Sequence, residues 1–179
     1  MYRQTYNSKL GKIQMESDGE VLTGLWFFDS KDNMKFNSKY EEKTLEIFEE
    51  TKKWLDIYFS GKNPDFTPKY RVINSTPFRE EVTKIMEKIP FGEVITYNDI
   101  AKEIARGRNI KKMSAQAVGG AVGANPICII IPCHRVVGSN GNLTGYGGGI
   151  KNKIKLLEIE GNDMSKFTLP KKGKLNEKM

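Results

Sequence analysis

Residues 125–137 are Asn-Pro-Ile-Cys-Ile-Ile-Ile-Pro-Cys-His-Arg-Val-Val, and the expected fold is built outward from this stretch. The apolar run 127–131 is mostly β-branched and has no polar alternation, which predicts a strand buried on both faces and ended by the proline that follows. The Val136-Val137 pair and the Asn140-Gly141 turn signal then predict a hairpin-like reversal. We therefore expect Cys133 at the point where a rigid core strand breaks.

The two cysteines of the chain have different surroundings. Cys133 is followed by the imidazole of His134 and the guanidinium of Arg135, and nearby positive charge lowers the pKa of a thiol from about 8.5, so we expect a reactive thiolate. Cys128 lies inside the apolar run, where we expect an inert, buried thiol. Two cysteines and one histidine are too few for a disulfide framework or a zinc cluster. We predict no metal site and no cofactor.

Three helices are expected between residue 76 and this stretch. Thr76 as N-cap and Pro77 at the first helical position open the first helix. The second starts at a capping box, Thr96–Asp99, and Ser114 caps the third, which runs to Gly123. The last two helices and the turn between them predict a helix-turn-helix.

That turn and the helix after it have features that suit nucleic acid. The turn carries four cations and the helix carries small side chains, namely Arg106, Arg108, Lys111 and Lys112, then Ala115, Ala117, Gly119, Gly120 and Ala121. The formal net charge of +7 also favours an anionic partner. The alternative is that the small residues only let helices pack tightly and that the cations are solvated. Both interpretations stay open on the residues alone.

The N-terminal half predicts an antiparallel sheet and one helix. Turn residues separate three strand-like segments, which are 2–6, 10–15 and 21–28. Helical spacing of apolar residues follows up to Gly61, and the proline-containing segment 61–75 is typical of a linker. We expect an α+β protein with an N-terminal αβ domain and linker over residues 1–75, a C-terminal domain over 76–165 and a basic tail over 166–179.

Length and composition set further limits. A chain of 179 residues makes one large domain or two small ones, and no apolar run reaches the about 18 residues that a membrane helix needs. Residues 1–15 lack the apolar core of a signal peptide. We expect a cytoplasmic monomer that does not bind a membrane.

The stretch 125–137 is followed by two more distinctive strings, Gly145-Tyr146-Gly147-Gly148-Gly149 and Leu156-Leu157-Glu158-Ile159-Glu160-Gly161. Together these strings resemble the methylated-DNA–protein-cysteine S-methyltransferases, also called O6-alkylguanine-DNA alkyltransferases. The resemblance covers roughly residues 76–161 and, more loosely, the N-terminal half. It implies a ribonuclease-H-like N-terminal αβ domain and a mostly helical C-terminal domain with a helix-turn-helix.

The resemblance implies DNA repair by direct reversal of damage. Cys133 would attack the alkyl carbon on O6 of guanine, with O4 of thymine as a further candidate, and keep the group as a thioether. In the family the cysteine proton passes through a water to the histidine, which a glutamate orients; this implies His134 and Glu160. Periodicity of the last helix cannot choose between Glu158 and Glu160, and the family pattern favours Glu160.

The resemblance also implies a pocket for a flipped-out base. The tyrosine at 97 would meet N3 of the base, the carbonyl at 136 its exocyclic amine and the amide at 147 its O6; the residues are Tyr97, Val136, Tyr146 as a wall, Gly147 and Gly148. Asn125 would bridge the turn before the buried strand to backbone near the site. Without the family, Tyr97 is equally well explained as a packing residue, and 145–149 as a flexible loop.

The helix 114–123 would enter the minor groove, where only short side chains fit, while the cationic turn grips phosphates. The residues expected to contact double-stranded DNA are Ser114, Ala115, Gln116, Ala117, Gly119 and Gly120 with Arg106, Arg108, Lys111, Lys112 and Arg135. Gln116 stands where the family often has an arginine that fills the gap left by the flipped base. Two other roles are open for Arg135: a structural clamp between the domains, which we favour, and a charge that favours the thiolate.

Two other classes within this resemblance remain. An alkyltransferase-like lesion-binding protein lacks the cysteine that this chain has at position 133. A regulatory module usually carries an added metal-binding domain, for which this chain has neither the length nor the cysteines. A Cys-His hydrolase of unrelated class is disfavoured because the chain has no second histidine.

Overall fold

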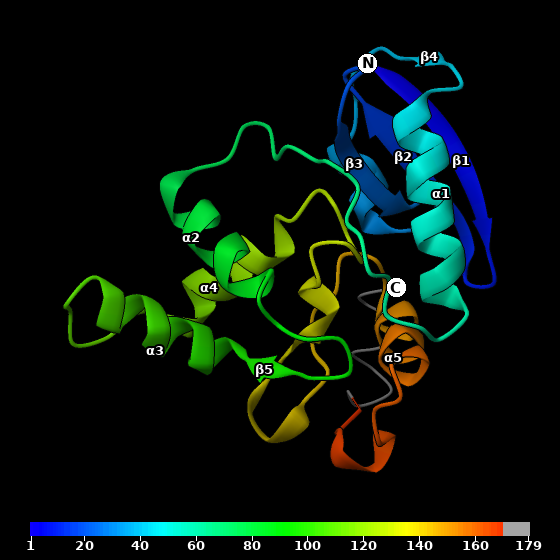
Figure 1. The fold of residues 1–179 in the computed structure, drawn as a ribbon. Helices are drawn as coiled ribbons and strands as arrows, with labels where there is room; N and C mark the ends of the chain where they lie inside the picture. Colours follow the sequence, from blue (N-terminus) through cyan, green and yellow to red (C-terminus); the bar gives the residue numbers. More distant parts are fainter. Residues whose placement is uncertain (170–179) are drawn as a thin grey trace.

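The computed structural model describes residues 1–169, and Figure 1 shows the sheet and α1 on one side of the molecule and α2, α3 and α4 on the other. The predicted antiparallel meander is confirmed as β1 (Tyr2–Ser8), β2 (Gly11–Ser17) and β3 (Leu22–Phe27). The short β4 (Glu41–Glu42) adds a parallel edge, giving the order β3-β2-β1-β4. Helix α1 (Glu46–Phe59) packs on this sheet, with the rings of Tyr6 and Phe59 stacked.

The segment 61–75 is irregular, as predicted for a linker, yet it is tied to the sheet. The Leu22 amide donates to the Lys69 carbonyl at 2.9 Å, and the Arg71 amide donates to the Leu22 carbonyl at 2.9 Å. Part of the segment therefore extends the β3 edge. We propose that the two domains divide at residue 75, just before α2 begins at Pro77.

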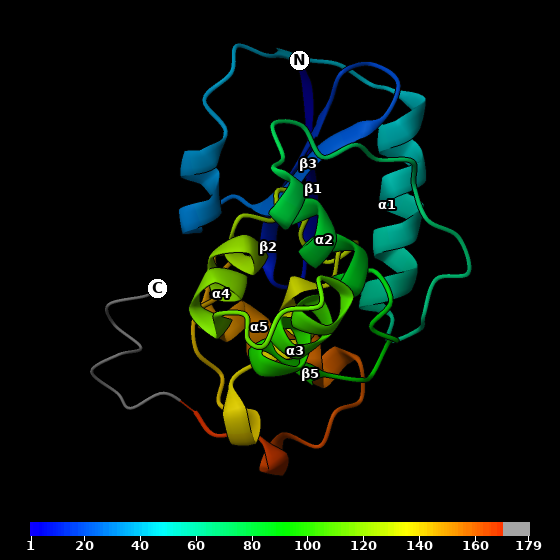
Figure 2. The same cartoon turned by 90° about the vertical axis from the view of Figure 1, so that its left-hand side faces the viewer.

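All three predicted helix starts of the C-terminal half are confirmed. The hydroxyl of Thr76 accepts from the Arg79 amide at the start of α2 (Pro77–Met86). Thr96 and Asp99 form the full capping box of α3 (Tyr97–Gly107), and Ser114 caps α4 (Ala115–Gly123). Figure 2 shows α2, α3 and α4 gathered into one bundle, so the predicted helix-turn-helix is present as α3 and α4.

The predicted core strand over 127–131 is wrong, although its burial is right. Ile127 alone pairs with Leu25 as an isolated bridge, and the residues after it form turns, with Ile129 at φ +70°. Ile127, Cys128, Ile129 and Ile131 are at most 1% exposed. A short apolar run between two prolines indicates burial but does not determine backbone shape, which explains the error. Cys133 therefore follows a buried turn rather than a strand.

The hairpin expected after Cys133 is also wrong. The strand β6 (Val136–Val137) pairs parallel with β5 (Ile95–Thr96), which comes from far earlier in the chain. The predicted turn does form, because Asn140 and Gly141 both have positive φ and the Gly138 amide donates to the Asn142 carbonyl at 2.8 Å. The turn leads toward α5 (Ile150–Ile159) instead of back along β6.

The first residues of the expected basic tail are held in place. A short 3-10 helix covers Met164–Lys166, and the Leu143 amide donates to the Thr168 carbonyl at 3.0 Å. The remaining tail, with Lys171, Lys172, Lys174 and Lys178, lies outside the described residues. Within residues 1–169, none of the helices has the length and apolar character needed to cross a bilayer.

The turn at Gly141 gives a test of this packing. Gly141 has φ +73°, and a Cβ there would collide with the backbone carbonyl of Lys166. We expect Gly141→Ala to lower the free energy of unfolding by roughly 1–3 kcal/mol in urea denaturation, because the backbone strain and the collision add. Gly107→Ala is the control, since a Cβ at Gly107 meets nothing within 4 Å. Equal stability of the two variants would contradict the close packing of this turn.

Candidate active site

The cysteine at the centre of the site lies in a short 3-10 helix, η2 (Cys133–Arg135), directly after the buried turn. Cys133 is 7% exposed, and its amide donates to the Ile131 carbonyl at 2.8 Å. Asn125 holds the preceding turn as expected, since its Nδ2 donates to the carbonyls of Ile131 at 2.9 Å and Ile127 at 3.3 Å. The position of Cys133 is thus fixed by its own backbone hydrogen bond and by the two hydrogen bonds through which the Asn125 side chain holds the preceding turn.

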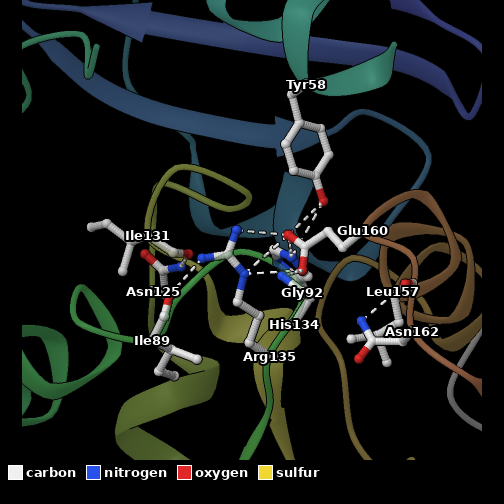
Figure 3. Close-up of polar contacts among 10 residues, drawn as sticks. All are labelled: Tyr58, Ile89, Gly92, Asn125, Ile131, His134, Arg135, Leu157, Glu160 and Asn162. Atoms are coloured by element: carbon white, nitrogen blue, oxygen red, sulfur yellow. Dashed lines mark hydrogen bonds and ion pairs between the residues drawn. The ribbon is translucent and has the colours of Figure 1, made fainter. Parts of the chain in front are cut away.

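The buried carboxylate of Glu160 is the shared partner of several polar groups, including His134 and Arg135 (Figure 3). His134 Nε2 lies 2.9 Å from Glu160 Oε1, and Arg135 donates from Nη2 to Oε1 at 2.7 Å and from Nε to both oxygens at 3.0 Å. Burial would raise the pKa of Glu160, but the hydrogen bonds and charges of His134 and Arg135 lower it to about 2. Glu160 is therefore ionised and buried, whereas Glu158 is exposed. The fold distinguishes two glutamates that periodicity could not.

The ionised carboxylate fixes the state of the imidazole. An ionised carboxylate only accepts, so Nε2 of His134 carries the proton. Nδ1 is buried and has no hydrogen-bond partner within residues 1–169. Burial lowers the pKa of His134 more than Glu160 raises it, which keeps the ring neutral near pH 7. Nδ1 is therefore a free acceptor, the state that a general base requires.

The expected thiolate at Cys133 is wrong for the resting protein. Burial raises the pKa of this thiol, the Asn125 side chain and Lys153 oppose that rise, and Asp32 adds to it. The neighbouring cations do not act as expected because Arg135 is ion-paired with Glu160 and His134 is neutral. Burial also raises the pKa of Cys128 well above its usual value, so the inert, buried thiol expected there agrees with the structure.

Arg135 is buried and bonded within the C-terminal half, which favours neither the expected DNA contact nor a bridge between the domains. It is 8% exposed, and besides Glu160 it donates from Nη1 to the Ile89 carbonyl at 2.7 Å. These partners all lie in the C-terminal half. The guanidinium is a clamp, as favoured from the sequence, but one that joins η2 to α5 and to the segment after α2.

Lys153 is a residue that sequence analysis missed. Its side chain is completely buried, its Nζ donates to the Val136 carbonyl at 2.7 Å, and it lies 5.9 Å from the ring centroids of Tyr97 and Tyr146. Burial lowers its pKa to about 8, against an opposing effect of Cys133. A signal was present, because Lys153 lies three residues after Ile150 on the buried stripe of α5.

The expected pocket residues are brought together around this lysine. Tyr146 is 8% exposed and its buried hydroxyl has no partner within residues 1–169, while the Tyr97 hydroxyl lies 3.4 Å from the Thr144 carbonyl. Gly148 approaches the Tyr146 ring so closely that a Cβ would lie 2.8 Å from it. The Val136 carbonyl already accepts from Lys153 but has a second lone pair.

The N-terminal domain contacts the loop 145–149, which carries Tyr146 and Gly148. Asp32 lies where a side chain at Gly147 would stand, so only glycine fits beside this carboxylate. Asp32 pairs with Lys35 at 2.5 Å, and Lys35 Nζ also donates to the Gly123 carbonyl at the end of α4 at 2.6 Å. Sequence analysis gave no sign of this contact, because it joins residues far apart in the chain.

The expected DNA-contact residues lie on an open surface of the helix-turn-helix. Ser114, Gln116, Ala117 and Gly120 are exposed, and Ala115 and Gly119 are half-buried. Added Cβ atoms at Gly120 and Gly123 would meet nothing within 4 Å, so this face of α4 is not packed against another helix. The alternative of tight helix packing therefore does not explain Gly120, whereas a Cβ at Gly119 would contact the Tyr97 ring at 3.9 Å.

The four cations of the turn are all exposed, but they differ in their partners. Arg108 forms an ion pair with Glu81 and lies over the Phe78 ring. No ion pair within residues 1–169 involves Arg106, Lys111 or Lys112. These three remain available to an anion, while Arg108 must first leave Glu81. Among residues 1–169, no three or more His, Cys, Asp and Glu residues are grouped so that they could hold a metal ion.

Comparison with known proteins matches both halves of the chain. The DNA binding domain of 6-O-methylguanine DNA methyltransferase matches residues 77–162, and the ribonuclease-like domain of 6-O-methylguanine DNA methyltransferase matches residues 1–69. The methylated-DNA–protein-cysteine methyltransferase of Methanosarcina acetivorans is 37% identical over 161 residues, covering 90% of this chain and 99% of that protein. This chain belongs to the 6-O-methylguanine DNA methyltransferase family.

Other members of the family agree in sequence and in structure. The Haemophilus influenzae methylated-DNA–protein-cysteine methyltransferase is 35% identical, covering 89% of this chain and 86% of that protein. The crystal structure of Mycobacterium tuberculosis OGT in complex with DNA superposes with a TM-score of 0.78 at 35% identity, covering 93% of this chain and 95% of that one. The α+β fold, with its ribonuclease-like N-terminal domain and helical DNA-binding domain, is therefore the fold of the family.

The two glutamates of α5 test the buried network. Glu160→Gln leaves the Arg135 guanidinium buried without its carboxylate, so we expect the free energy of unfolding to fall by about 3 kcal/mol. Glu158→Gln removes an exposed carboxylate paired only with Lys155 and should change stability by less than about 0.5 kcal/mol. Urea unfolding of both variants at pH 7 measures the difference. A similar loss in the two would contradict the buried charge.

Proposed function

We propose that this protein repairs alkylated DNA by moving a methyl group from O6 of guanine to Sγ of its own Cys133, once per molecule. The observation that carries the proposal is the geometry at η2. A buried thiol adjoins a neutral imidazole whose Nδ1 is free and whose Nε2 is fixed by ionised Glu160. Such an arrangement removes a thiol proton when a substrate arrives, without keeping a reactive thiolate beforehand.

The proposed chemistry is a displacement at carbon. His134 Nδ1 accepts the thiol proton through a water, Sγ attacks the methyl carbon, and the C–O6 bond breaks with its electron pair going to O6. We assign stabilisation of the negative charge that develops on the leaving base to Tyr97 and to Lys153, whose Nζ lies 5.9 Å from the Tyr97 ring centroid. The thioether product offers water no easy route back, which makes the protein a single-turnover reagent.

DNA is proposed to dock on α4. Its exposed small residues would enter the minor groove, Arg106, Lys111 and Lys112 would contact phosphates, and the damaged nucleotide would flip into the pocket beside Tyr146. Gln116 is exposed near the start of α4, where it could take the place of the flipped base. The relative from Mycobacterium tuberculosis that superposes on this chain was crystallised with DNA, which supports this partner.

The other classes are less well supported. A protein that only binds lesions has no use for a cysteine at position 133 with a base beside it. We further propose that the protein works in the cytoplasm as a monomer, without a bound cofactor.

Intact-mass analysis tests the proposal. After mixing with duplex DNA containing O6-methylguanine, we expect the wild type to gain the mass of one methylene group, about 14 Da, because one S–H becomes S–CH₃. Cys128→Ala should gain the same mass, since Cys128 is an inert, buried thiol. Cys133→Ala should gain nothing.

Two results of the same measurement would contradict the proposal. A wild type that binds the damaged duplex but gains no mass would contradict methyl transfer and favour lesion binding. Mass gained by Cys133→Ala would place the acceptor elsewhere.

A further inference from the structure

Tyr58 is a buried residue of the N-terminal domain that the proposed chemistry does not use. It lies on α1, near the end of the helix, and its side chain is completely inaccessible. Its ring stacks on Trp54 at a centroid distance of 5.4 Å and meets Phe59 and Phe91 edge-on. Packing explains an aromatic ring at this position but does not explain its hydroxyl.

The hydroxyl reaches the catalytic network of the other domain. Tyr58 donates to Glu160 Oε1 at 3.1 Å, and its oxygen lies 3.3 Å from His134 Nε2. Figure 3 shows the ring descending from α1 with its oxygen pointing at both groups. Burial, reinforced by Glu160, raises the pKa of Tyr58 well above 10, so the hydroxyl keeps its proton and acts as a donor.

Tyr58, His134 and Glu160 all contact one another, and both Tyr58 and His134 reach the same oxygen, Oε1 of Glu160. Oε1 of Glu160 is the oxygen that faces His134 Nε2, and Tyr58 donates to that same oxygen from the side of α1. Arg135 holds both oxygens and so fixes the carboxylate, but it does not touch the imidazole through a hydrogen bond. Tyr58 alone among these partners contacts both members of the His134–Glu160 pair.

We propose that Tyr58 is a positioning residue for methyl transfer, whose hydroxyl holds the Nε2–H of His134 on Glu160 and leaves Nδ1 free to act on Cys133. The N-terminal domain thereby completes the catalytic network of the C-terminal domain. This inference rests on the proposed function. It predicts that the hydroxyl, rather than the ring, matters for the rate.

The first experiment removes only that hydroxyl. In Tyr58→Phe of the full chain, we expect the single-turnover rate at saturating protein to fall about tenfold, the usual effect of losing a hydrogen bond to a charged group. The affinity for duplex DNA should not change, because Tyr58 is far inside the protein. The control is Tyr6→Phe, which removes a hydroxyl bonded to Asp56 on the same helix at 2.6 Å. It should keep both the rate and the affinity of the wild type.

A second readout separates positioning from general structure. His134 is the only histidine of the chain, so ¹⁵N-histidine labelling reports one imidazole. We expect the wild type to show the Nε2–H tautomer, and Tyr58→Phe to show a shifted Nε2–H resonance with a growing share of the Nδ1–H tautomer. Tyr6→Phe should match the wild type.

Several results would overturn the inference. They are a Tyr58→Phe rate within twofold of the wild type, an imidazole spectrum unchanged by the substitution, or a rate loss matched by an equal loss of DNA affinity. If Tyr58→Phe does not fold, an NMR measurement on the wild type tests the contact between Tyr58 and His134 instead. A slowly exchanging Tyr58 hydroxyl proton with a cross-peak to His134 supports the contact, and its absence rejects it. A wild type without methyl transfer would refute the proposed function while leaving the tautomer measurement valid.

Discussion

The structure depends on one buried negative charge, the carboxylate of Glu160 at the end of α5. The helix dipole opposes a carboxylate at this end, and burial adds a further cost. Arg135 and His134 outweigh both, holding the pKa of Glu160 at about 2. The carboxylate also accepts from Tyr58 of α1 and from the Gly92 amide. It thus joins both domains and fixes the turn that carries the cysteine.

In the mechanism that we propose, this buried carboxylate determines how the thiol is activated. The negative charge is shared with Arg135, so the imidazole stays neutral and Cys133 stays protonated at rest. A preformed thiolate would be open to oxidation and to alkylation by small molecules. A buried thiol that loses its proton only as the methyl carbon is attacked avoids both. The completely buried Lys153 adds a positive charge 5.9 Å from the rings of Tyr97 and Tyr146, and in the proposed reaction this charge would stabilise the leaving guanine as it becomes negative.

Sequence analysis succeeded where the signal was local or chemically specific. The caps at Thr96 and Ser114 were predicted because capping joins neighbours in the chain. Glu160 was chosen by resemblance, and its burial agrees with that choice. The strand over 127–131 was wrongly predicted because an apolar run determines burial better than backbone shape. The ionisation of Cys133 was wrongly predicted because charge was judged from chain neighbours, whereas tertiary contacts decide where each charge is neutralised.

The pH dependence of single-turnover methyl transfer, at saturating protein, tests the central claim most directly. The pKa of His134 lies below 6.5, so its neutral ring can accept the thiol proton throughout the neutral range. We therefore predict a rate that falls at acidic pH, where the ring becomes protonated, and that does not rise from about pH 7 to about pH 8.5, where Lys153, with a pKa of about 8, begins to lose its charge. A rate that climbs about tenfold per pH unit over this range would mean that solvent ionises Cys133 unaided. That result would contradict activation of the thiol by His134 and Glu160.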